Sequence, residues 1–327
     1  MVQFGISSLA IILAGIFLAR STDVIGELTG MGRLFAGSIL LAGATSLPEL
    51  MVDISAIREG LPDIAVGDLM GSSLMNLLIL AIADLCHRNP NKMFSRAGAQ
   101  HALSAALSIN VTIIACIAAF LGPQLAAFNL GEIGIGPLAI AIAYTLGLRL
   151  VYYDQKILTP EGATRNPPVD RTRLAKEFSI YFASALSVFI AAPYLAESAG
   201  EIADISGLGN TFIGSSLVAF CTSLPEVVST IAAIRMGAFD LAVGNIFGSN
   251  SFNMILLVPL DLFHKGNLLA AISHMHFVTA LTVVLATSVA VMGQLYQVEK
   301  RKKFIEPDAF AIIGIVIGAL LILYWVG

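Results

Sequence analysis

Apolar residues occur along most of this chain in long continuous runs, separated by short polar segments rich in glycine, proline or charge. About 20 apolar residues in a helix suffice to cross a bilayer, and soluble helices and strands rarely need such runs. The pattern therefore predicts ten membrane-spanning helices. Their expected bounds are residues 4–20, 34–58, 62–85, 98–121, 133–153, 177–196, 208–235, 239–262, 269–293 and 306–326.

The composition supports this prediction. Hydrophobic residues make up 57% of the chain, charged residues only 12%, and the mean hydropathy is +0.86, whereas a soluble domain carries about 25% charged residues. The expected fold class is all-α, a polytopic membrane protein surrounded by lipid. Three cysteines, an odd number, indicate no disulfide framework. No nucleic-acid partner is expected, and the sequence indicates no particular oligomeric state.

A polar segment, residues 154–176, divides the chain into a first five-helix half, residues 1–153, and a second, residues 177–327. With the N-terminus outside, 16 of the 18 Lys and Arg residues fall in cytoplasmic loops, which is the expected bias. We therefore predict a cell-membrane protein with both termini outside and a cytoplasmic linker. Because five is odd, the second half enters the membrane from the opposite side. Inverted repeats of this kind are common in secondary transporters, although an old duplication without functional trace is an alternative.

Two segments 177 residues apart have nearly the same sequence. GSILLAGATSLPEL at 37–50 matches GSSLVAFCTSLPEV at 214–227, and the following residues up to 84 and 261 continue the match. The two segments agree at 23 of 48 positions. Each copy places one glutamate, Glu49 or Glu226, inside an apolar span, where a carboxylate is costly and usually functional.

The shared TSLPE motif predicts a break in the helix. A proline has no N–H, so Pro48 and Pro225 each leave a carbonyl of the preceding turn without its helical partner. Broken backbone at membrane depth is tolerated only inside protein or beside a wet cavity. A simple proline kink, with the hydroxyls bonded to their own backbone, is the alternative interpretation. Besides its carboxylate and loosened carbonyls, each copy offers two hydroxyls, those of Thr45 and Ser46 or of Thr222 and Ser223.

The second shared motif is G-S-x-x-x-N. Ser72 and Asn76 are four residues apart, as are Ser249 and Asn253, so each pair lies on one helix face. Glycines four residues apart precede both pairs and allow close helix packing. A packing seam with asparagine bridging two helices is the alternative. The two interpretations are compatible, because close packing would bring these side chains against the glutamates.

The repeated residues supply only oxygen ligands: carboxylates, amide carbonyls, hydroxyls and backbone carbonyls. Such sites suit hard cations like Ca²⁺ and Na⁺ rather than zinc or copper. Two carboxylates balance one Ca²⁺ or two Na⁺, so the same acids could bind either ion in turn. That competition is the simplest chemistry for exchange.

Other buried acids rank lower in this scheme. Asp53 lies one turn beyond Glu49, but its counterpart is Thr230. Asp68 stands where the second copy has Asn245, so we leave both aspartates outside the core site. Two equivalent acids at expected helix ends, where water would solvate them, are Asp84 and Asp261.

These motifs resemble the alpha-repeats of the cation/calcium exchanger superfamily, in its compact microbial, sodium/calcium exchanger-like form. The resemblance covers the whole topology and implies that Glu49 and Glu226 are the central Ca²⁺ ligands. It implies that the carbonyls of Thr45 and Thr222 complete that site. The implied Na⁺ ligands are Ser46, Ser72, Ser223, Ser249, Asn76 and Asn253, with the backbone oxygens of Ala42 and Ala219 as outer ligands.

Departures from the family pattern bear on the coupling ion. Ala44 and Cys221 stand where the family often has glycine. The potassium-dependent branch ties K⁺ to an aspartate at the position of Asn253, so K⁺ co-transport is not expected. Proton-coupled relatives typically show Gly-Asn-x-x-Glu in place of Thr-Ser-Leu-Pro-Glu, which favours Na⁺ here.

The resulting hypothesis is a Na⁺/Ca²⁺ antiporter, not an enzyme, that works by alternating access and has no resident cofactor. Its transported ions are Ca²⁺ and Na⁺. Spans 1 and 6 carry no site residues and are the expected sliding gates. A Ca²⁺/H⁺ exchanger is the alternative, and a cation channel lined by the same acids is a third hypothesis.

Overall fold

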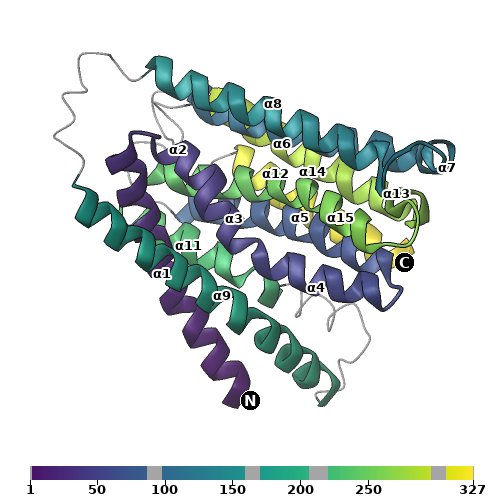
Figure 1. Ribbon diagram of the computed structural model, residues 1–327, viewed down its shortest axis with the longest axis horizontal. Coiled ribbons are helices and arrows are strands. Elements are labelled where there is room, and N and C mark those ends of the chain that lie inside the picture. Colours follow the sequence, from purple (N-terminus) through teal and green to yellow (C-terminus); the bar gives the residue numbers. More distant parts are fainter. Residues whose placement is uncertain (1, 87–97, 159–169, 206–219, 296–306, 327) are drawn as a thin grey trace. The chain divides into compact units, whose positions relative to one another are not determined.

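The computed structural model describes residues 2–86, 98–158, 170–205, 220–295 and 307–326, which are almost entirely helical (Figure 1). Within these ranges the only strands are β1 (Asn129–Leu130) and β2 (Ile133–Gly134), which pair antiparallel. The helices are α1 (Val2–Thr29), α2 (Arg33–Ala36), the π-helix η1 (Gly37–Leu41), α3 (Ala42–Thr45), α4 (Leu47–Arg58), α5 (Pro62–Cys86), α6 (Gly98–Phe120), α7 (Gly122–Leu125), α8 (Ile135–Leu158), α9 (Arg171–Ile205), α11 (Leu224–Arg235), α12 (Phe239–Phe263), α13 (Leu268–Ala271), α14 (Met275–Leu295) and α15 (Pro307–Val326).

The lengths of these helices fit a membrane protein. Among the described residues, seven helices are long and apolar enough to cross a membrane, and the bent pair 33–45 and 47–58 makes an eighth span. Each predicted span overlaps a described helix, although residues 206–219 of the seventh lie outside the described ranges. The protein is therefore a multi-pass membrane protein, while the number of ten spans stays a prediction.

The ninth predicted span, residues 269–293, is interrupted in the structure. The short helix α13 is capped at its start by Asn267, whose side chain accepts a hydrogen bond from the Ala270 amide, 3.1 Å away. Ile272 is extended, and α14 begins only at Met275. The apolar pattern misses this break because an asparagine cap is a local hydrogen bond rather than a change in hydropathy.

Contacts divide the chain into two compact units, and each unit combines segments of both predicted halves. Unit 1 is Met1–Pro48 with Leu148–Ser249, and unit 2 is Glu49–Gly147 with Asn250–Gly327. The predicted halves are defined by sequence repetition and the units by contact, so the bounds 1–153 and 177–327 stay a prediction.

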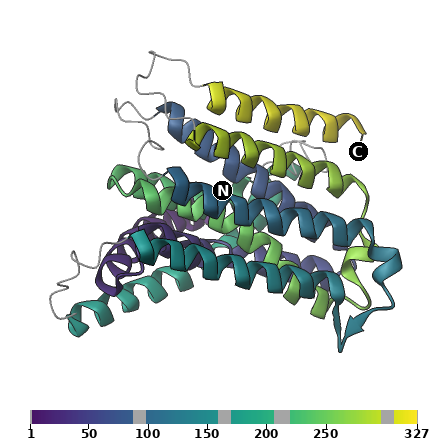
Figure 2. The ribbon, with the colours of Figure 1, turned by 90° about the horizontal axis from the view of Figure 1, so that it is seen from above.

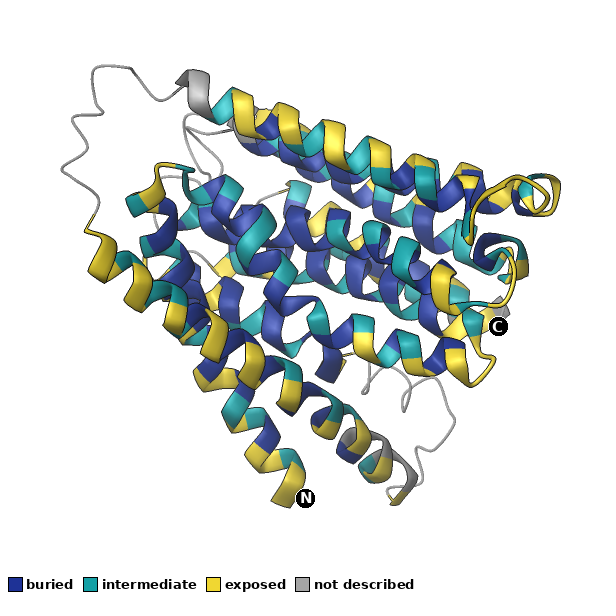
Figure 3. Cartoon of the chain, in the orientation of Figure 1, coloured by how far each residue is buried: buried dark blue, intermediate teal, exposed yellow. Residues whose placement is uncertain are grey.

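In unit 1, α1 lies along α9 and also packs against α11 (Figure 1). The buried positions Ile11, Leu18 and Ile25 are seven residues apart, so they fall on one face of α1. Close approach to α11 depends on Gly15, because a Cβ there would lie 2.9 Å from Cγ1 of Val228. Figure 3 shows the opposite sides of α1 and α9 as exposed.

In unit 2, α14 packs against both α6 and α15, and α15 packs against α5 as well (Figure 2). The rings of Phe120 and Phe277, 6.0 Å apart, join the end of α6 to the start of α14. These two helices therefore run antiparallel.

The expected solvation of Asp84 and Asp261 at helix ends is wrong. Both residues are buried in the structure. Asp261 accepts hydrogen bonds from the amides of Gly134, at 2.6 Å, and Leu268, at 2.8 Å. Its carboxylate thus ties α12 to the β-hairpin and to α13, so backbone amides rather than water surround it.

Large apolar side chains cover the outer faces of the described helices (Figure 3). On α1 and α9 they include Ile6, Leu9, Phe17, Phe182 and Leu186. A soluble monomer rarely exposes so much contiguous apolar surface, whereas lipid chains solvate it without cost. The exterior therefore agrees with the membrane assignment.

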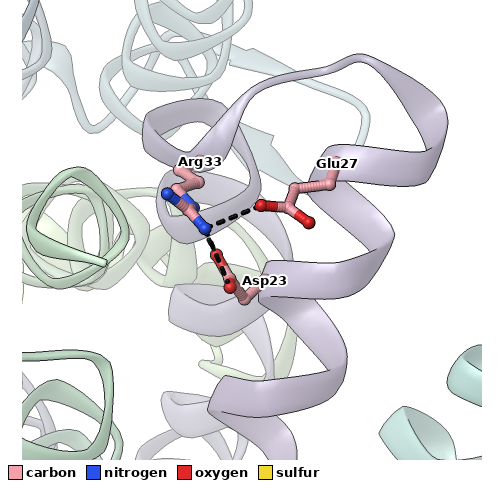
Figure 4. A network of polar contacts seen from close by, with 3 residues as sticks. All are labelled: Asp23, Glu27 and Arg33. Carbon is pink, nitrogen blue, oxygen red and sulfur yellow. Dashed lines mark hydrogen bonds and ion pairs between the residues drawn. The ribbon is translucent and has the colours of Figure 1, made fainter. Parts of the chain in front are cut away.

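An ion-pair network joins the end of α1 to the start of α2 in unit 1 (Figure 4). Nε of Arg33 lies 2.6 Å from Oδ1 of Asp23, and Nη2 lies 2.7 Å from Oε1 of Glu27. The two acids are four residues apart and so share one face of α1. Gly30 and Gly32, both with positive φ, make the turn that brings Arg33 back over them.

Candidate ion-binding site

The first TSLPE motif sits at a break between two helices. The chain runs through α2, η1 and α3 and stops at Ser46, which has φ −89° and ψ 5°; α4 then starts at Leu47, and the bend is 43°. The predicted break at the proline motif is therefore confirmed for this copy. The π-helix before it was not predicted. Such π-turns concentrate at functional sites, and here the hydroxyl of Tyr181 on α9 donates to the Leu40 carbonyl at 2.7 Å.

The second TSLPE motif has the same local geometry. Ser223 has φ −81° and ψ 3°, within 10° of Ser46 in both angles, and α11 starts at the next residue. Pro225 falls in the first turn of α11, where its missing N–H costs least. Sequence repetition at this motif thus corresponds to a repeated backbone break.

Unit 1 brings residues of both motif copies together. The hydroxyl of Ser46 donates to Oε1 of Glu226 at 3.3 Å, and both residues are at most 1% exposed. Thr45 behaves differently, because its hydroxyl bonds the carbonyls of Leu41 and Ala42 at 3.1 and 3.2 Å. The proline-kink interpretation thus describes the Thr45 hydroxyl, while the Ser46 hydroxyl is directed at a carboxylate.

The remaining predicted site residues of unit 1 are also buried. The Oγ atom of Ser249 on α12 is enclosed and has no hydrogen-bond partner among the described residues. An oxygen in that state can accept a cation without losing an existing bond. Ala42, Thr222 and Ser223 are at most 1% exposed, whereas Ala219 lies outside the described residues.

Glycines allow the break region to pack against α12 in unit 1. A Cβ at Gly248 would lie 2.5 Å from Cα of Ser38, and one at Gly37 would lie 2.5 Å from the Leu241 carbonyl oxygen. A Cβ at Gly244 would collide with the Leu34 carbonyl. The predicted close packing at the second G-x-x-x-G is therefore confirmed, with backbone against backbone.

Unit 2 holds the asparagines of the second motif. Nδ2 of Asn76 donates to Oδ1 of Asn250 at 3.0 Å, and Nδ2 of Asn250 donates to the Ser73 carbonyl at 3.1 Å. Nδ2 of Asn253 donates to the Leu69 carbonyl at 3.2 Å and to Ser73 Oγ at 3.3 Å. As the α5 residue number rises in these pairs, the α12 number falls, so α5 and α12 cross antiparallel.

These bonds orient two amide oxygens. The Oδ1 atoms of Asn76 and Asn253 are buried and have no hydrogen-bond partner among the described residues. A buried carbonyl oxygen without a donor costs about 1–3 kcal/mol, and a bound cation would remove that cost. The structure therefore presents both amides oxygen-first, which is the orientation that a hard cation needs.

Glu49 and Ser72 complete the set of predicted ligands in unit 2, and each is 1% exposed. No three His, Cys, Asp or Glu residues gather into a metal-binding group anywhere in the described ranges. A cation in this protein would thus rely on single carboxylates supplemented by neutral oxygens, as the sequence predicted.

Sequence reasoning missed two residues that hold the asparagines in place. Ser73 and Asn250 occupy equivalent positions of the two motifs, immediately after Ser72 and Ser249. Their chemistry differs between the copies, so an identity-based search passes over them. The available signal was their position in the polar cluster of each span.

The comparison with protein families now decides the assignment. The model of the sodium/calcium exchanger protein family matches residues 1–153 and 177–326. This chain belongs to the sodium/calcium exchanger family. Members of the family are antiporters that cross the membrane several times.

Named relatives support the family assignment. Sodium/calcium exchanger MaX1 of Methanosarcina acetivorans is 27% identical over 272 residues, which are 75% of this chain and 77% of that protein. Inner membrane protein YrbG of Escherichia coli is 27% identical over 248 residues, covering 74% and 73%. The Ca²⁺/H⁺ antiporter ChaA of Bacillus subtilis is 24% identical over 275 residues, covering 79% and 75%.

Solved structures of the sodium-calcium exchanger NCX_Mj share the fold. The form soaked with Na⁺ and no Ca²⁺ matches with a TM-score of 0.75 and 19% identity, over 98% of this chain and 97% of that one. A form soaked with Na⁺ and Sr²⁺ gives a TM-score of 0.73. As a member of the sodium/calcium exchanger family, the chain thus has both the fold and the motif residues of a cation antiporter.

Proposed function

We propose that this protein exchanges Na⁺ for Ca²⁺ across the cell membrane by alternating access, with Glu49 and Glu226 as the central ligands. The observation that carries the proposal is the Ser46–Glu226 hydrogen bond, because it joins a hydroxyl of one motif copy to the carboxylate of the other. Hydroxyl and carboxylate oxygens at this spacing form one side of a hard-cation site.

The proposed ligands divide by the ion that they serve. Ca²⁺ would be held by the two glutamates and by the backbone carbonyls of Thr45 and Thr222. Na⁺ would take oxygens from neutral groups as well, and their buried, partner-free atoms at Ser249, Asn76 and Asn253 support this role. The further Na⁺ ligands in this proposal are Ser46, Ser72, Ser223 and the carbonyls of Ala42 and Ala219.

Exchange follows from the charge of the two carboxylates. One Ca²⁺ or two Na⁺ neutralise them equally, and an unneutralised pair is costly at membrane depth. Na⁺ entering down its gradient would displace Ca²⁺, and the empty site would be disfavoured during the transition. No resident cofactor takes part in this scheme.

The proposed topology is a pair of inverted five-helix repeats, with both termini outside and residues 154–176 in the cytoplasm. The antiparallel crossing of α5 and α12 supports it, because equivalent spans of inverted repeats run in opposite directions. The distribution of Lys and Arg supports the orientation.

The moving elements in this proposal are α1 and α9. α1 packs on α11 through Gly15, two turns of mostly small or aliphatic contacts that offer little resistance to sliding. α11 carries Glu226, so a shift of α1 along it would change access to that carboxylate. Closure of this kind is typical of alternating access around a fixed site.

A Ca²⁺/H⁺ exchanger is the second candidate, because the relative ChaA bears that activity in its name. Two gradients separate the candidates. Purified protein in vesicles should take up Ca²⁺ when Na⁺ is higher inside, and should not respond to a pH gradient alone. Uptake driven by the pH gradient without Na⁺ would establish Ca²⁺/H⁺ exchange instead.

A further inference from the structure

The two repeats differ in charge at one pair of equivalent positions. Counting at the fixed offset of 177 residues, Asp53 corresponds to Thr230 and Asp68 corresponds to Asn245. The first copy therefore has two acids where the second has two neutral polar residues. Neither aspartate belongs to the proposed ligand set.

The neutral pair in unit 1 shows what these positions do. Nδ2 of Asn245 donates to Oγ1 of Thr230 at 3.0 Å and to Oγ of Ser229 at 3.2 Å. All three residues are fully buried. A donor on α12 thus satisfies acceptors on α11, one helical turn beyond Glu226.

The acid pair in unit 2 has no such donor. Asp53 is 0% exposed, and neither of its carboxyl oxygens has a hydrogen-bond partner among the described residues. The Oδ2 atom of Asp68 is also buried without a partner. The two carboxyl groups are close enough to interact electrostatically. Two ionised carboxylates here would repel each other and lack any compensating bond.

One proton would restore the bond seen in unit 1. A protonated aspartate has the shape of asparagine and offers an O–H where the amide offers an N–H. Two nearby carboxyls readily keep one proton between them, because both cannot ionise at short range. The described ranges also hold no third acid, histidine or cysteine that would complete a metal group here.

We propose that Asp53 and Asp68 share one proton, which takes the place of the amide hydrogen that Asn245 donates in the second repeat. Unit 2 thus contains a protonation site that its counterpart lacks. The inference rests on this pair alone and does not depend on whether Na⁺ or H⁺ is the counter-ion.

Other titratable groups surround the pair. Glu49 precedes Asp53 by one turn on α4, and the His276 ring on α14 would lie 3.3 Å from a Cβ at Gly67, next to Asp68. His276 is itself 2.9 Å from Asp63. The remaining charged groups on the elements that form or contact α4 and α5 in unit 2 are Arg58, Glu59, Asp84, Asp261 and Asp308.

Infrared difference spectroscopy of the purified full-length protein tests the proposal, because a protonated carboxyl has its own C=O stretching band. We expect the wild type to lose such a band on titration from acidic to alkaline buffer. Asp68→Asn should lack that band, as should the double variant Asp53→Thr with Asp68→Asn, which recreates the pair of the second repeat. Glu132→Gln, an exposed acid in the β-hairpin turn, should leave the spectrum unchanged.

Two results would overturn the inference. One is a wild-type spectrum indistinguishable from that of Asp68→Asn at every pH. The other is a band that responds to added Na⁺ at constant pH and not to pH itself, which would make the pair a metal-cation site. If Asp68→Asn does not fold, Asp53→Asn removes the other acid and must abolish the same band.

Discussion

The hydroxyl of Ser46 donates to Oε1 of Glu226 across a 3.3 Å separation, although the two residues are 180 positions apart in the chain. Each belongs to a TSLPE motif, one in the first copy and one in the second. The contact shows that the copies are used jointly, since a residue of one stabilises the acid of the other. It also distinguishes Ser46 from its neighbour Thr45, whose hydroxyl is bonded to backbone.

Replacing the central acids should abolish transport. Glu226→Gln and Glu49→Gln keep the side-chain shape but remove the charge that would balance the cation. Loss of one partner of a buried charge pair costs about 3–5 kcal/mol, so Ca²⁺ uptake into vesicles should fall by roughly 100-fold or more. Glu132→Gln makes the same chemical change at an exposed turn and should transport normally. Normal uptake by either site variant would refute the ligand assignment.

Ser46→Ala should weaken ion binding without unfolding the protein. The variant removes the hydrogen bond to Glu226, and bonds to charged groups are worth about 1.5–3 kcal/mol. We expect the Na⁺ concentration for half-maximal exchange to rise roughly tenfold or more. Ser55→Ala is the matched control, because that exposed hydroxyl bonds only the Met51 carbonyl one turn back. Equal effects of the two substitutions would contradict a role for the Ser46–Glu226 bond.

Asn250→Ala should lower Na⁺ affinity although Asn250 is not a proposed ligand. Its side chain accepts from Asn76 and donates to the Ser73 carbonyl, so its removal frees the Asn76 amide to rotate. The cost of the lost partners is about 1–3 kcal/mol. Affinity measured by isothermal titration with Na⁺ should fall, while exposed Asn129→Ala should not change it. A lower melting temperature with unchanged affinity would mean that Asn250 only stabilises the fold.

Gly248→Ala should destabilise the protein, because the new Cβ would lie 2.5 Å from the Ser38 backbone. Overpacking of this kind typically costs about 1–3 kcal/mol, and here both sides of the contact are main chain and cannot rotate away. Thermal unfolding in detergent should show a clear fall in the melting temperature. Gly314→Ala, at a position with open space around it, is the control and should melt like the wild type. A stable Gly248→Ala variant would contradict the close approach of η1 and α12.

Much of this protein could be inferred from its residues alone. The membrane class follows from hydropathy, which is a local property of each span. The helix break follows from a proline that cannot donate a hydrogen bond. The importance of Glu49 and Glu226 follows from the cost of a carboxylate in an apolar run, which is independent of its neighbours. Repetition at a fixed offset then marked the same residue types twice.

Only the tertiary structure decided which polar groups bond to each other. Thr45 and Ser46 are adjacent and chemically alike, yet one bonds backbone and the other bonds Glu226. Asp261 was expected in water and is instead enclosed by two amides. The π-turn at Gly37–Leu41 and the supporting role of Asn250 were likewise invisible. Hydropathy and backbone chemistry act within one segment, whereas a hydrogen-bond partner is supplied by whichever helix packs alongside, and packing is a property of the folded chain.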